Sequence, residues 1–309
     1  MRETSHSVTA SAPGSIGNVG PGLDVLGLAL EGPRDEVTLR FRSDTSDRIL
    51  DAGHPDLPTD PTANTASVAA RAVLRHLGVE QGIDVTVVKG LPLAGGQGGS
   101  AASAVAGAVA AAVLLQAPLE PPQILGFALE GEMVASGRQA DNLAPSLLGG
   151  LILVRSTDPV ETIRLPLPAG LHVVLAHPAQ RLETRVARGI LPTVVSREVA
   201  IRQAANLATV VAGACLDNLA LLGRGIDDLI AEPVRAGLLP GFSAAKAAAL
   251  GAGAAGCSIS GAGPTAFAFA GDRDTANRVA GAMKAAYRDA GVVANVSVTT
   301  PSVDGARSW

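Results

Sequence analysis

The spacing of apolar residues along the chain predicts strands and helices that alternate from one end to the other. From Glu36 to Arg42 apolar and polar side chains alternate, which places Val37, Leu39 and Phe41 on one face of a half-buried strand. Further strands are expected at residues 83–88, 147–154, 171–176, 257–260, 265–270 and 292–298. Helical spacing predicts helices at residues 64–77, 100–116, 121–136, 194–222, 242–250 and 275–290, with a shorter one beginning near residue 227. The interleaving predicts a mixed α+β fold.

Two stretches lack this periodicity. Residues 44–62 are rich in Asp, Pro and Thr, which is typical of a loop. Residues 155–168 combine three prolines with charges of both signs, which indicates a domain junction. Because 309 residues are many for a single core, we expect an N-terminal domain at 1–155 and a C-terminal domain at 156–309.

The composition describes a globular protein that handles small molecules. Hydrophobic residues make up 47% of the chain and charged residues 17%, so the core is built mainly from Ala, Val and Leu. A net charge of −4 argues against nucleic acid or an anionic membrane as a partner. With only five Phe, one Tyr and one Trp, platforms for stacking bases are not expected.

Three features indicate a cytoplasmic protein. Two cysteines, Cys215 and Cys257, do not suggest a disulfide framework. The segment Met1–Ala12 is polar and lacks an apolar signal segment. Ala101–Leu115 is apolar but short and mostly alanine, as expected of a buried helix rather than a membrane span.

A glycine-rich stretch within Leu91–Val105 is the strongest sign of chemistry. It carries Gly95, Gly96, Gly98 and Gly99 between a predicted strand and an alanine-rich predicted helix. Glycines let the backbone approach a ligand closely, and the helix that follows presents unpaired N–H groups and a positive dipole end. This junction therefore predicts an anion site, and a nucleotide phosphate is the expected anion.

Other interpretations of the loop are weaker. A Walker A loop requires a lysine before Ser100, and this chain has Gly99 there. The dinucleotide-binding fingerprint matches by letters at residues 96–101, but Glu120 lies in a proline-rich loop and closes no strand. A glycine-rich turn without a ligand stays open on this segment alone.

Several segments together resemble the GHMP small-molecule kinases, and within them the branch that acts on homoserine. The phosphate-binding loop is one of them, and another reads Ser-Ile-Ser-Gly-Ala-Gly-Pro-Thr at 258–265. The resemblance is carried, in colinear order, by residues 12–27, 92–102, 140–150, 184–192, 230–241 and 258–265. It therefore extends over nearly the whole chain.

The resemblance implies both a fold and a reaction. The fold would be the two-domain GHMP kinase fold, with an N-terminal domain like domain 2 of ribosomal protein S5 and a ferredoxin-like C-terminal domain. The site would lie between the two domains. The reaction would be transfer of the ATP γ-phosphoryl group to the side-chain hydroxyl of L-homoserine, in threonine biosynthesis. A homodimer is also implied.

The resemblance assigns five residues to the amino-acid substrate. Asp24 would accept hydrogen bonds from the α-ammonium, and Arg188 and Arg235 would hold the α-carboxylate. Asn18 and Asn142 would hold the hydroxyl. Taken singly, Asp24 is also a plausible turn residue, each arginine a surface charge and Asn142 a cap. Only their joint occurrence favours a site.

The resemblance also assigns residues to the nucleotide and to its metal ion. Mg²⁺ would be held by Ser100 and Glu132, although Glu132 alone would read as an ordinary helix carboxylate. Thr184 would contact the γ-phosphate. The expected nucleotide-binding residues are Asn64, Pro92, Leu93, Ala94, Gly95, Gly96, Gln97, Gly98, Gly99, Ser100, Ala101, Ala102 and Gly261.

We expect catalysis by alignment rather than by a strong side-chain base. Phosphoryl transfer depends mainly on positioning and charge neutralisation. Many GHMP kinases place an Asp where a base would act, and Asn142 stands at that position here, next to Asp141. Asn142, Arg188 and Thr184 are therefore the expected catalytic residues.

Four residues depart from the family pattern. Gln97 replaces an apolar residue and Gly99 a serine in the phosphate loop, while Gln139 replaces a common His and Gly17 a small polar residue or Ala. These departures leave two alternatives open. One is a GHMP kinase for a different small alcohol, and the other is a ligand-binding regulator without catalysis on the same fold.

Overall fold

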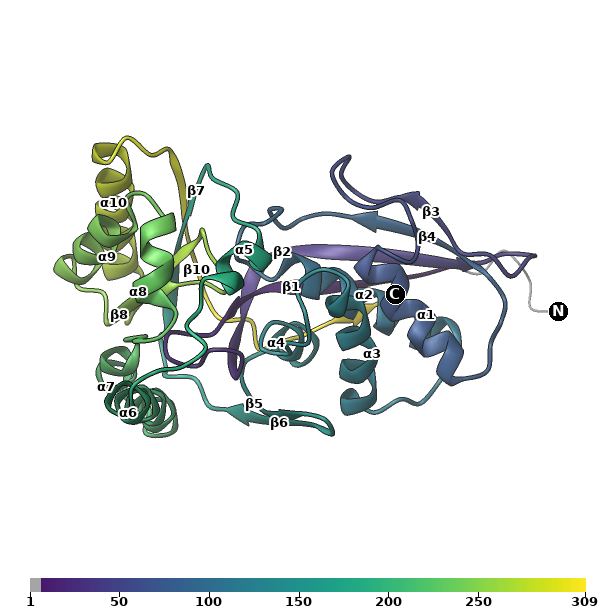
Figure 1. Cartoon of the computed structure of the whole chain (residues 1–309), viewed down its shortest axis with the longest axis horizontal. Coiled ribbons are helices and arrows are strands. Elements are labelled where there is room, and N and C mark those ends of the chain that lie inside the picture. The colour runs from purple at the N-terminus through teal and green to yellow at the C-terminus, as the bar shows by residue number, and fades with distance from the viewer. Residues whose placement is uncertain (1–6) are drawn as a thin grey trace.

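The computed structural model describes residues 7–309, which form two β-sheets with helices packed against them (Figure 1). The predicted mixture of helices and strands is confirmed. The absence of a signal segment was expected from the polar residues 1–12. Residues 1–6 of that segment lie outside the described residues. Within residues 7–309, no helix has the length and apolar character that crossing a membrane requires.

The seven-stranded sheet is built mainly from the N-terminal half. Its strands are β1 (Ser7–Gly17), β2 (Leu26–Phe41), β3 (Arg48–Asp51), β4 (Ile83–Val88), β5 (Leu151–Thr157), β6 (Val160–Leu165) and β11 (Arg307–Ser308). They follow the order β11-β1-β2-β4-β3, and β2 also pairs with β5, which pairs with β6. The alternation from Glu36 to Arg42 predicted the buried face correctly, since Val37, Leu39 and Phe41 are all buried.

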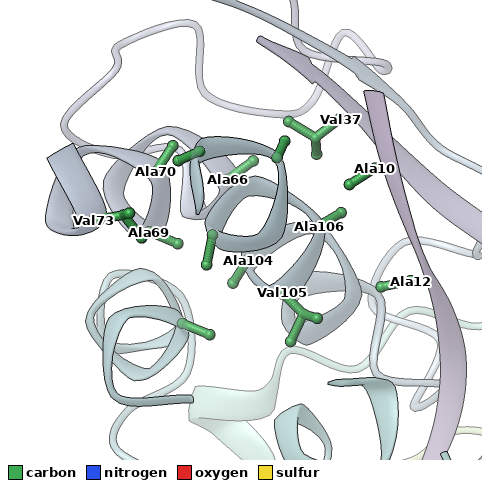
Figure 2. Packing of buried hydrophobic residues seen from close by; sticks show 14 of the residues in the cluster. Ala10, Ala12, Val37, Ala66, Ala69, Ala70, Val73, Ala104, Val105 and Ala106 are labelled. Carbon is green, nitrogen blue, oxygen red and sulfur yellow. The ribbon is translucent and has the colours of Figure 1, made fainter. Parts of the chain in front are cut away.

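Four helices accompany this sheet: α1 (Thr65–His76), α2 (Gly99–Leu114), α3 (Pro121–Met133) and α4 (Leu143–Leu148). Helix α2 is buried on nearly every side and consists largely of alanine. Because alanine side chains are short, α1 and α2 approach each other closely, with Ala66, Ala69 and Ala104 between them (Figure 2). This core is thus filled by small side chains on closely packed helices rather than by large aromatic side chains.

The four-stranded sheet belongs to the C-terminal half. Its strands are β7 (His172–Pro178), β8 (Gly256–Ile259), β9 (Ala266–Ala270) and β10 (Ala294–Thr299), in the antiparallel order β10-β7-β9-β8. The helices of this half are α5 (Thr184–Gly189), α6 (Arg197–Cys215), α7 (Leu219–Gly225), α8 (Glu232–Arg235), α9 (Phe242–Gly251) and α10 (Arg273–Asp289). Helix α5 lies in the middle of the molecule, above the junction of the two sheets (Figure 1).

A shared hydrophobic cluster joins the two halves. Ile16 and Leu28 from the first sheet belong to the same buried cluster as Val173, Leu175 and Phe267 from the second. Burying such apolar surface stabilises by about 25 cal/mol per Å². The two sheets therefore form one packed body, and the chain ends by returning to the first sheet, where β11 pairs with β1.

The sequence misplaced several elements. Residues 44–62 contain strand β3, which pairs in parallel with β4 and is tied to it by an ion pair between Arg48 and Asp84. Leu147 and Leu148 end helix α4 instead of beginning a strand, and no helix begins at Asp227 because the chain turns there until Glu232.

The expected domain junction coincides with a hairpin. The stretch 155–168 holds part of β5 and all of β6, and both strands belong to the seven-stranded sheet. A boundary after residue 155 would therefore divide this hairpin. We propose that the C-terminal domain begins after Leu165 and that the chain crosses back to the first sheet near its end.

The close approach of α1 and α2 can be tested at Gly107. A Cβ atom there would lie 2.3 Å from the backbone oxygen of Ala66, whereas a Cβ at Gly126 on α3 would meet nothing within 4 Å. We expect Gly107→Ala to lower the free energy of unfolding by about 1–3 kcal/mol. Gly126→Ala should leave it unchanged or raise it by up to about 1 kcal/mol. Urea unfolding measures both, and equal effects would contradict this packing.

Candidate active site

A cavity of about 640 Å³ lies between the two halves of the molecule. Its volume is typical of small-molecule sites, which are about 300–1,000 Å³. Of the residues predicted for the site, Gln97, Ala101 and Ala102 are the three that do not line it. Ala101 and Ala102 are buried in the alanine-rich core on α2, so only their backbones are close to the loop.

The glycine-rich loop is fixed from the opposite half of the chain. The Ser260 hydroxyl donates to the backbone oxygen of Gly96 at 2.6 Å, and the Thr265 hydroxyl donates to that of Gly95 at 2.5 Å. Gln97 turns away from the cavity, and its amide Nε2 lies 3.4 Å from the Thr265 hydroxyl. The turn at 260–265 therefore holds the loop beside the N-terminus of α2, whose Gly98 cap leaves the first N–H groups without a side-chain partner.

Asn64, expected near the adenine, begins helix α1. Its side-chain oxygen accepts from the N–H groups of Ala66 and Ser67, and its amide donates to the backbone oxygen of Pro58 at 3.1 Å. Asn64 thus lines the cavity while capping a helix, and it fixes the loop that leads into α1.

Ser100 and Glu132 meet at the end of the cavity where α2 begins. The Ser100 hydroxyl donates to Glu132 Oε1 at 2.8 Å, and the Ser136 hydroxyl donates to the same oxygen. Glu132 Oε2 is buried without a hydrogen-bond partner. Burial raises the pKa of Glu132 to about 7. A buried carboxylate with one oxygen unpartnered fits a cation.

Lys89, which was not among the residues predicted from the sequence, also lines the cavity beside the glycine-rich loop. Its ammonium pairs with the fully buried Asp35 and donates to the backbone oxygen of Gly99 at 2.9 Å and to the Ser103 hydroxyl at 3.0 Å. The available signal was a lysine directly after a buried strand and directly before the glycine-rich loop.

Asp24 and Arg188 meet at the other end of the cavity. Their side chains form a two-pronged ion pair, with Nη1 to Oδ2 at 3.0 Å and Nη2 to Oδ1 at 2.8 Å. Arg188 Nε is buried and has no hydrogen-bond partner. The groups expected to hold the ammonium and the carboxylate of a substrate therefore hold each other in this structure.

Arg235 is buried next to this pair. It is only 3% exposed, and it donates from Nε to the backbone oxygen of Ala187 at 3.2 Å and from Nη1 to that of Gly261 at 3.0 Å. Burial, and then the nearby charge of Arg188, lower the pKa of Arg235. Two neighbouring guanidinium groups, one deeply buried, create a site for an anion.

Asn18 connects this end of the cavity to the turn at 260–265. Its amide Nδ2 donates to the backbone oxygen of Gly261 at 2.8 Å, and its Oδ1 accepts from the N–H of Asp24 at 3.1 Å. Its own N–H donates to Asp141 Oδ2 at 2.9 Å. Asn18 thus organises the loop, and one amide hydrogen remains for a ligand.

Asp141 and Asn142 lie between the two ends. Burial, reinforced by Asp24, raises the pKa of Asp141 to about 6. Asn142 Oδ1 accepts from the Ser15 hydroxyl at 2.9 Å. A Cβ on Gly17 would come within 2.3 Å of Asn142 Nδ2 and 2.6 Å of Asp141 Oδ2. Because residue 17 is glycine instead of the residue expected in the family, the side chains of Asn142 and Asp141 have the space that they occupy.

Helix α5 and the segment before it complete the cavity. Thr184, expected near the γ-phosphate, begins α5 and lines the cavity together with Gln139. Arg181 and Asp56, neither of which the sequence analysis singled out, form an ion pair of 2.6 Å between the two halves. No motif marked this pair, because its partners lie 125 positions apart.

The family models match the chain in both halves. The GHMP kinases N terminal domain matches residues 64–150, and the GHMP kinases C terminal domain matches residues 210–289. The chain is 42% identical over 263 residues to a homoserine kinase from Chloroherpeton thalassium, which covers 81% of this chain and 82% of the relative.

Solved structures agree. The crystal structure of homoserine kinase from Cytophaga hutchinsonii superposes with a TM-score of 0.93 at 40% identity, over 100% of this chain and 99% of that one. The L. major mevalonate kinase in complex with R-mevalonate shares the fold at a TM-score of 0.73 and 17% identity, covering 97% of this chain and 99% of that one. A cavity with a glycine-rich phosphate loop on this two-domain fold defines a small-molecule kinase. The chain belongs to the GHMP kinases, in the homoserine kinase family.

The unusual pKa of Glu132 makes a prediction about stability. Because burial raises the pKa from 4.5 to about 7, ionisation of Glu132 destabilises the free protein progressively as the pH rises through this interval. In the absence of metal and nucleotide, Glu132→Gln should raise the free energy of unfolding by roughly 1–3 kcal/mol at pH 8 and change it little at pH 5.

The matched control is Glu130→Gln on the same helix, where the carboxylate is exposed and pairs with Arg75. It should bring no gain at pH 8. Thermal unfolding at the two pH values measures both variants, and an equal gain at both pH values for Glu132→Gln would contradict the raised pKa.

Proposed function

We propose that this protein transfers the γ-phosphoryl group of ATP to the side-chain hydroxyl of L-homoserine and releases O-phospho-L-homoserine and ADP. The relatives at 40–42% identity are homoserine kinases, which supports this substrate. The observation that carries the proposal is a pair of unpartnered atoms. Among residues 7–309, four buried side-chain polar atoms lack a partner, and two of them, Arg188 Nε and Glu132 Oε2, belong to residues that line this one cavity.

Binding of the substrate would replace the ion pair between Asp24 and Arg188 by ion pairs of each residue with the substrate. The α-ammonium of homoserine takes the place of part of the Arg188 guanidinium on Asp24, and the α-carboxylate binds Arg188 and Arg235. Since Asp24 and Arg188 already neutralise each other, a zwitterion adds no net charge to the site. A substrate with only one of the two charges would leave a partly buried group unpaired, which is unfavourable.

ATP would lie along the glycine-rich loop, with Asn64 toward the adenine and Thr184 toward the γ-phosphate. When bound, Mg²⁺ neutralises charge on the transferred phosphoryl group. Ser100 and Glu132 are the residues that would hold it. Within residues 7–309 no three His, Cys, Asp or Glu side chains are grouped to hold a metal by themselves, so phosphate oxygens must complete its shell. Lys89 supports the loop through its bond to the backbone oxygen of Gly99.

The chemical step needs alignment more than proton abstraction. The homoserine hydroxyl oxygen forms a bond to the γ-phosphorus while the bond to the β–γ bridging oxygen breaks, and ADP leaves. Asn142 Nδ2 orients the hydroxyl, since its Oδ1 is held by Ser15. The hydroxyl proton passes to an oxygen of the transferred phosphoryl group and from there to solvent, while the phosphoryl group stays on the product. Arg188 offsets negative charge on the phosphoryl group during its transfer.

The setting of the reaction follows from the same assignment. We propose that the enzyme serves threonine biosynthesis in the cytoplasm and acts on ATP and L-homoserine without nucleic acid or a membrane. The net charge of −4 supports this choice of partners. A homodimer is proposed from the family resemblance.

The substrate proposal is tested by coupled ADP release with ATP and Mg²⁺. Acceptors are L-homoserine, D-homoserine, L-serine, L-threonine, mevalonate and galactose. We expect selective turnover of L-homoserine, and Arg235→Ala should lower kcat/KM by about a hundred-fold or more because the carboxylate loses a buried partner. Arg202→Ala, at an exposed position on α6, is the control and should be unchanged.

Other results would redirect the assignment. Turnover of a different acceptor would replace homoserine as the substrate. ATP binding without turnover of any acceptor would favour a regulator and would make the departures at Gly99 and Gln139 decisive.

Asp141→Asn tests catalysis without a base. Asparagine keeps an oxygen for the N–H of Asn18, so the geometry should survive, and we expect kcat to fall by less than about ten-fold. Asn142→Ala should lower kcat by about a hundred-fold, because it removes the group that aligns the hydroxyl. If Asp141→Asn lost about a thousand-fold in kcat with both binding affinities intact, Asp141 would be a base. The pH profile of kcat would then follow its pKa of about 6.

A further inference from the structure

A buried glutamine on helix α6 connects two loops, one that carries Asp24 and one that leads to Arg235. Gln203 is 8% exposed, and its amide Nε2 donates to the backbone oxygen of Pro21 at 3.0 Å and to Asp228 Oδ1 at 2.9 Å. Its Oε1 accepts from the N–H of Leu229 at 2.8 Å. Both amide hydrogens and the amide oxygen are thus used, and every partner belongs to one of the two loops.

The first of these loops leads to Arg235. Asp228 is 6% exposed, and its carboxylate accepts from the N–H groups of Ile230, Ala231 and Glu232 at 2.8–3.2 Å. These bonds shape the turn that begins α8, the helix on which Arg235 lies. Because Gln203 holds both Asp228 and Leu229, it fixes where this turn stands.

The second loop, residues 18–24, carries the ammonium side of the site. Asn18, Val19 and Asp24 have positive φ angles of 66°, 42° and 62°, a region that residues other than glycine rarely adopt. Such a backbone persists only where its surroundings determine it. The bond from Gln203 to Pro21 acts at the middle of this strained loop.

We propose that Gln203 is a positioning residue that sets the separation between the ammonium-binding Asp24 and the carboxylate-binding Arg235. A zwitterion must satisfy both groups at once, so it depends on their separation, whereas a ligand with one charge does not. Gln203 contacts neither group and does not line the cavity. The inference rests on the proposed function, since it concerns the same amino-acid site.

The experiment compares Gln203→Met with a matched control. Methionine has a similar volume and length but none of the three hydrogen bonds. Asn206→Ala is the control, since Asn206 lies one turn further along α6 and its amide donates to the backbone oxygen of Asp227 at 2.8 Å, with no bond to residues 18–24. KM is measured for L-homoserine and for ATP. Inhibition constants are measured for 4-hydroxybutanoate, which lacks the ammonium, and for 3-aminopropan-1-ol, which lacks the carboxylate.

We expect Gln203→Met to raise KM for L-homoserine by about ten-fold while KM for ATP and both inhibition constants change by less than about three-fold. Asn206→Ala should leave all four values within about three-fold. Gln203→Glu keeps an acceptor for Leu229 but sets a carboxylate against Asp228 and Pro21, so it should reproduce the pattern of Gln203→Met. If Gln203→Met does not fold, Gln203→Glu carries the test with the same measurements.

Three results would overturn the inference: an unchanged KM for L-homoserine, an equal loss for all four ligands, or the same pattern in Asn206→Ala. Turnover of L-homoserine by the unaltered protein tests the function separately. Its absence would overturn the function and the inference together, whereas normal turnover with an unaffected Gln203→Met would overturn the inference alone.

Discussion

The backbone of Gly261 connects the groups at the end of the cavity that holds Asp24, Arg188 and Arg235. Its carbonyl oxygen accepts from Asn18 Nδ2 at 2.8 Å and from Arg235 Nη1 at 3.0 Å, and its N–H donates to the backbone oxygen of Gly17 at 3.0 Å. One backbone unit from the C-terminal half therefore fixes a loop of the N-terminal half and the most deeply buried arginine of the site. Because a backbone carbonyl holds both side chains, their placement depends on how the two sheets pack.

Charge at this end of the cavity is balanced only in part. Asp24 and Arg188 pair with each other, but Arg235 has only backbone partners and Asp141 is buried with a raised pKa. Burial of these groups makes the free protein less stable than an apolar site would, and a ligand that pairs them recovers that energy. The cavity thus presents charges of both signs at the expense of the stability of the empty protein. Fold alone does not determine the ligand, because the L. major mevalonate kinase in complex with R-mevalonate shares this fold.

The sequence predicted most of the helices and the composition of the cavity, because those features depend on local signals. Apolar spacing located α1 and α10, and colinear motifs gathered the cavity residues although they lie up to 243 positions apart, as Asn18 and Gly261 do. Gln203 and strand β3 were missed, since each depends on contacts between distant segments that leave no local pattern, whereas Lys89 was missed although its place between a strand and the glycine-rich loop was a local signal. Gln203 in particular looks like any polar residue of a helix until the turn at Asp228 and the loop at Pro21 are both in place.

The departures from the family pattern divide into two kinds when their surroundings are compared. Gly17 is required, because a Cβ there would collide with Asn142 and Asp141 as they are placed in this chain. Gly99 is not required, since a Cβ there would lie 3.4 Å from Lys89 Nζ and 3.5 Å from the Pro92 oxygen, which are ordinary contacts. The missing serine hydroxyl is therefore not excluded by space, and the ammonium of Lys89, held by Asp35 and Ser103, already supplies positive charge at that point of the loop. The glycine-rich loop of this chain thus combines the backbone N–H groups at the start of α2 with a buried lysine.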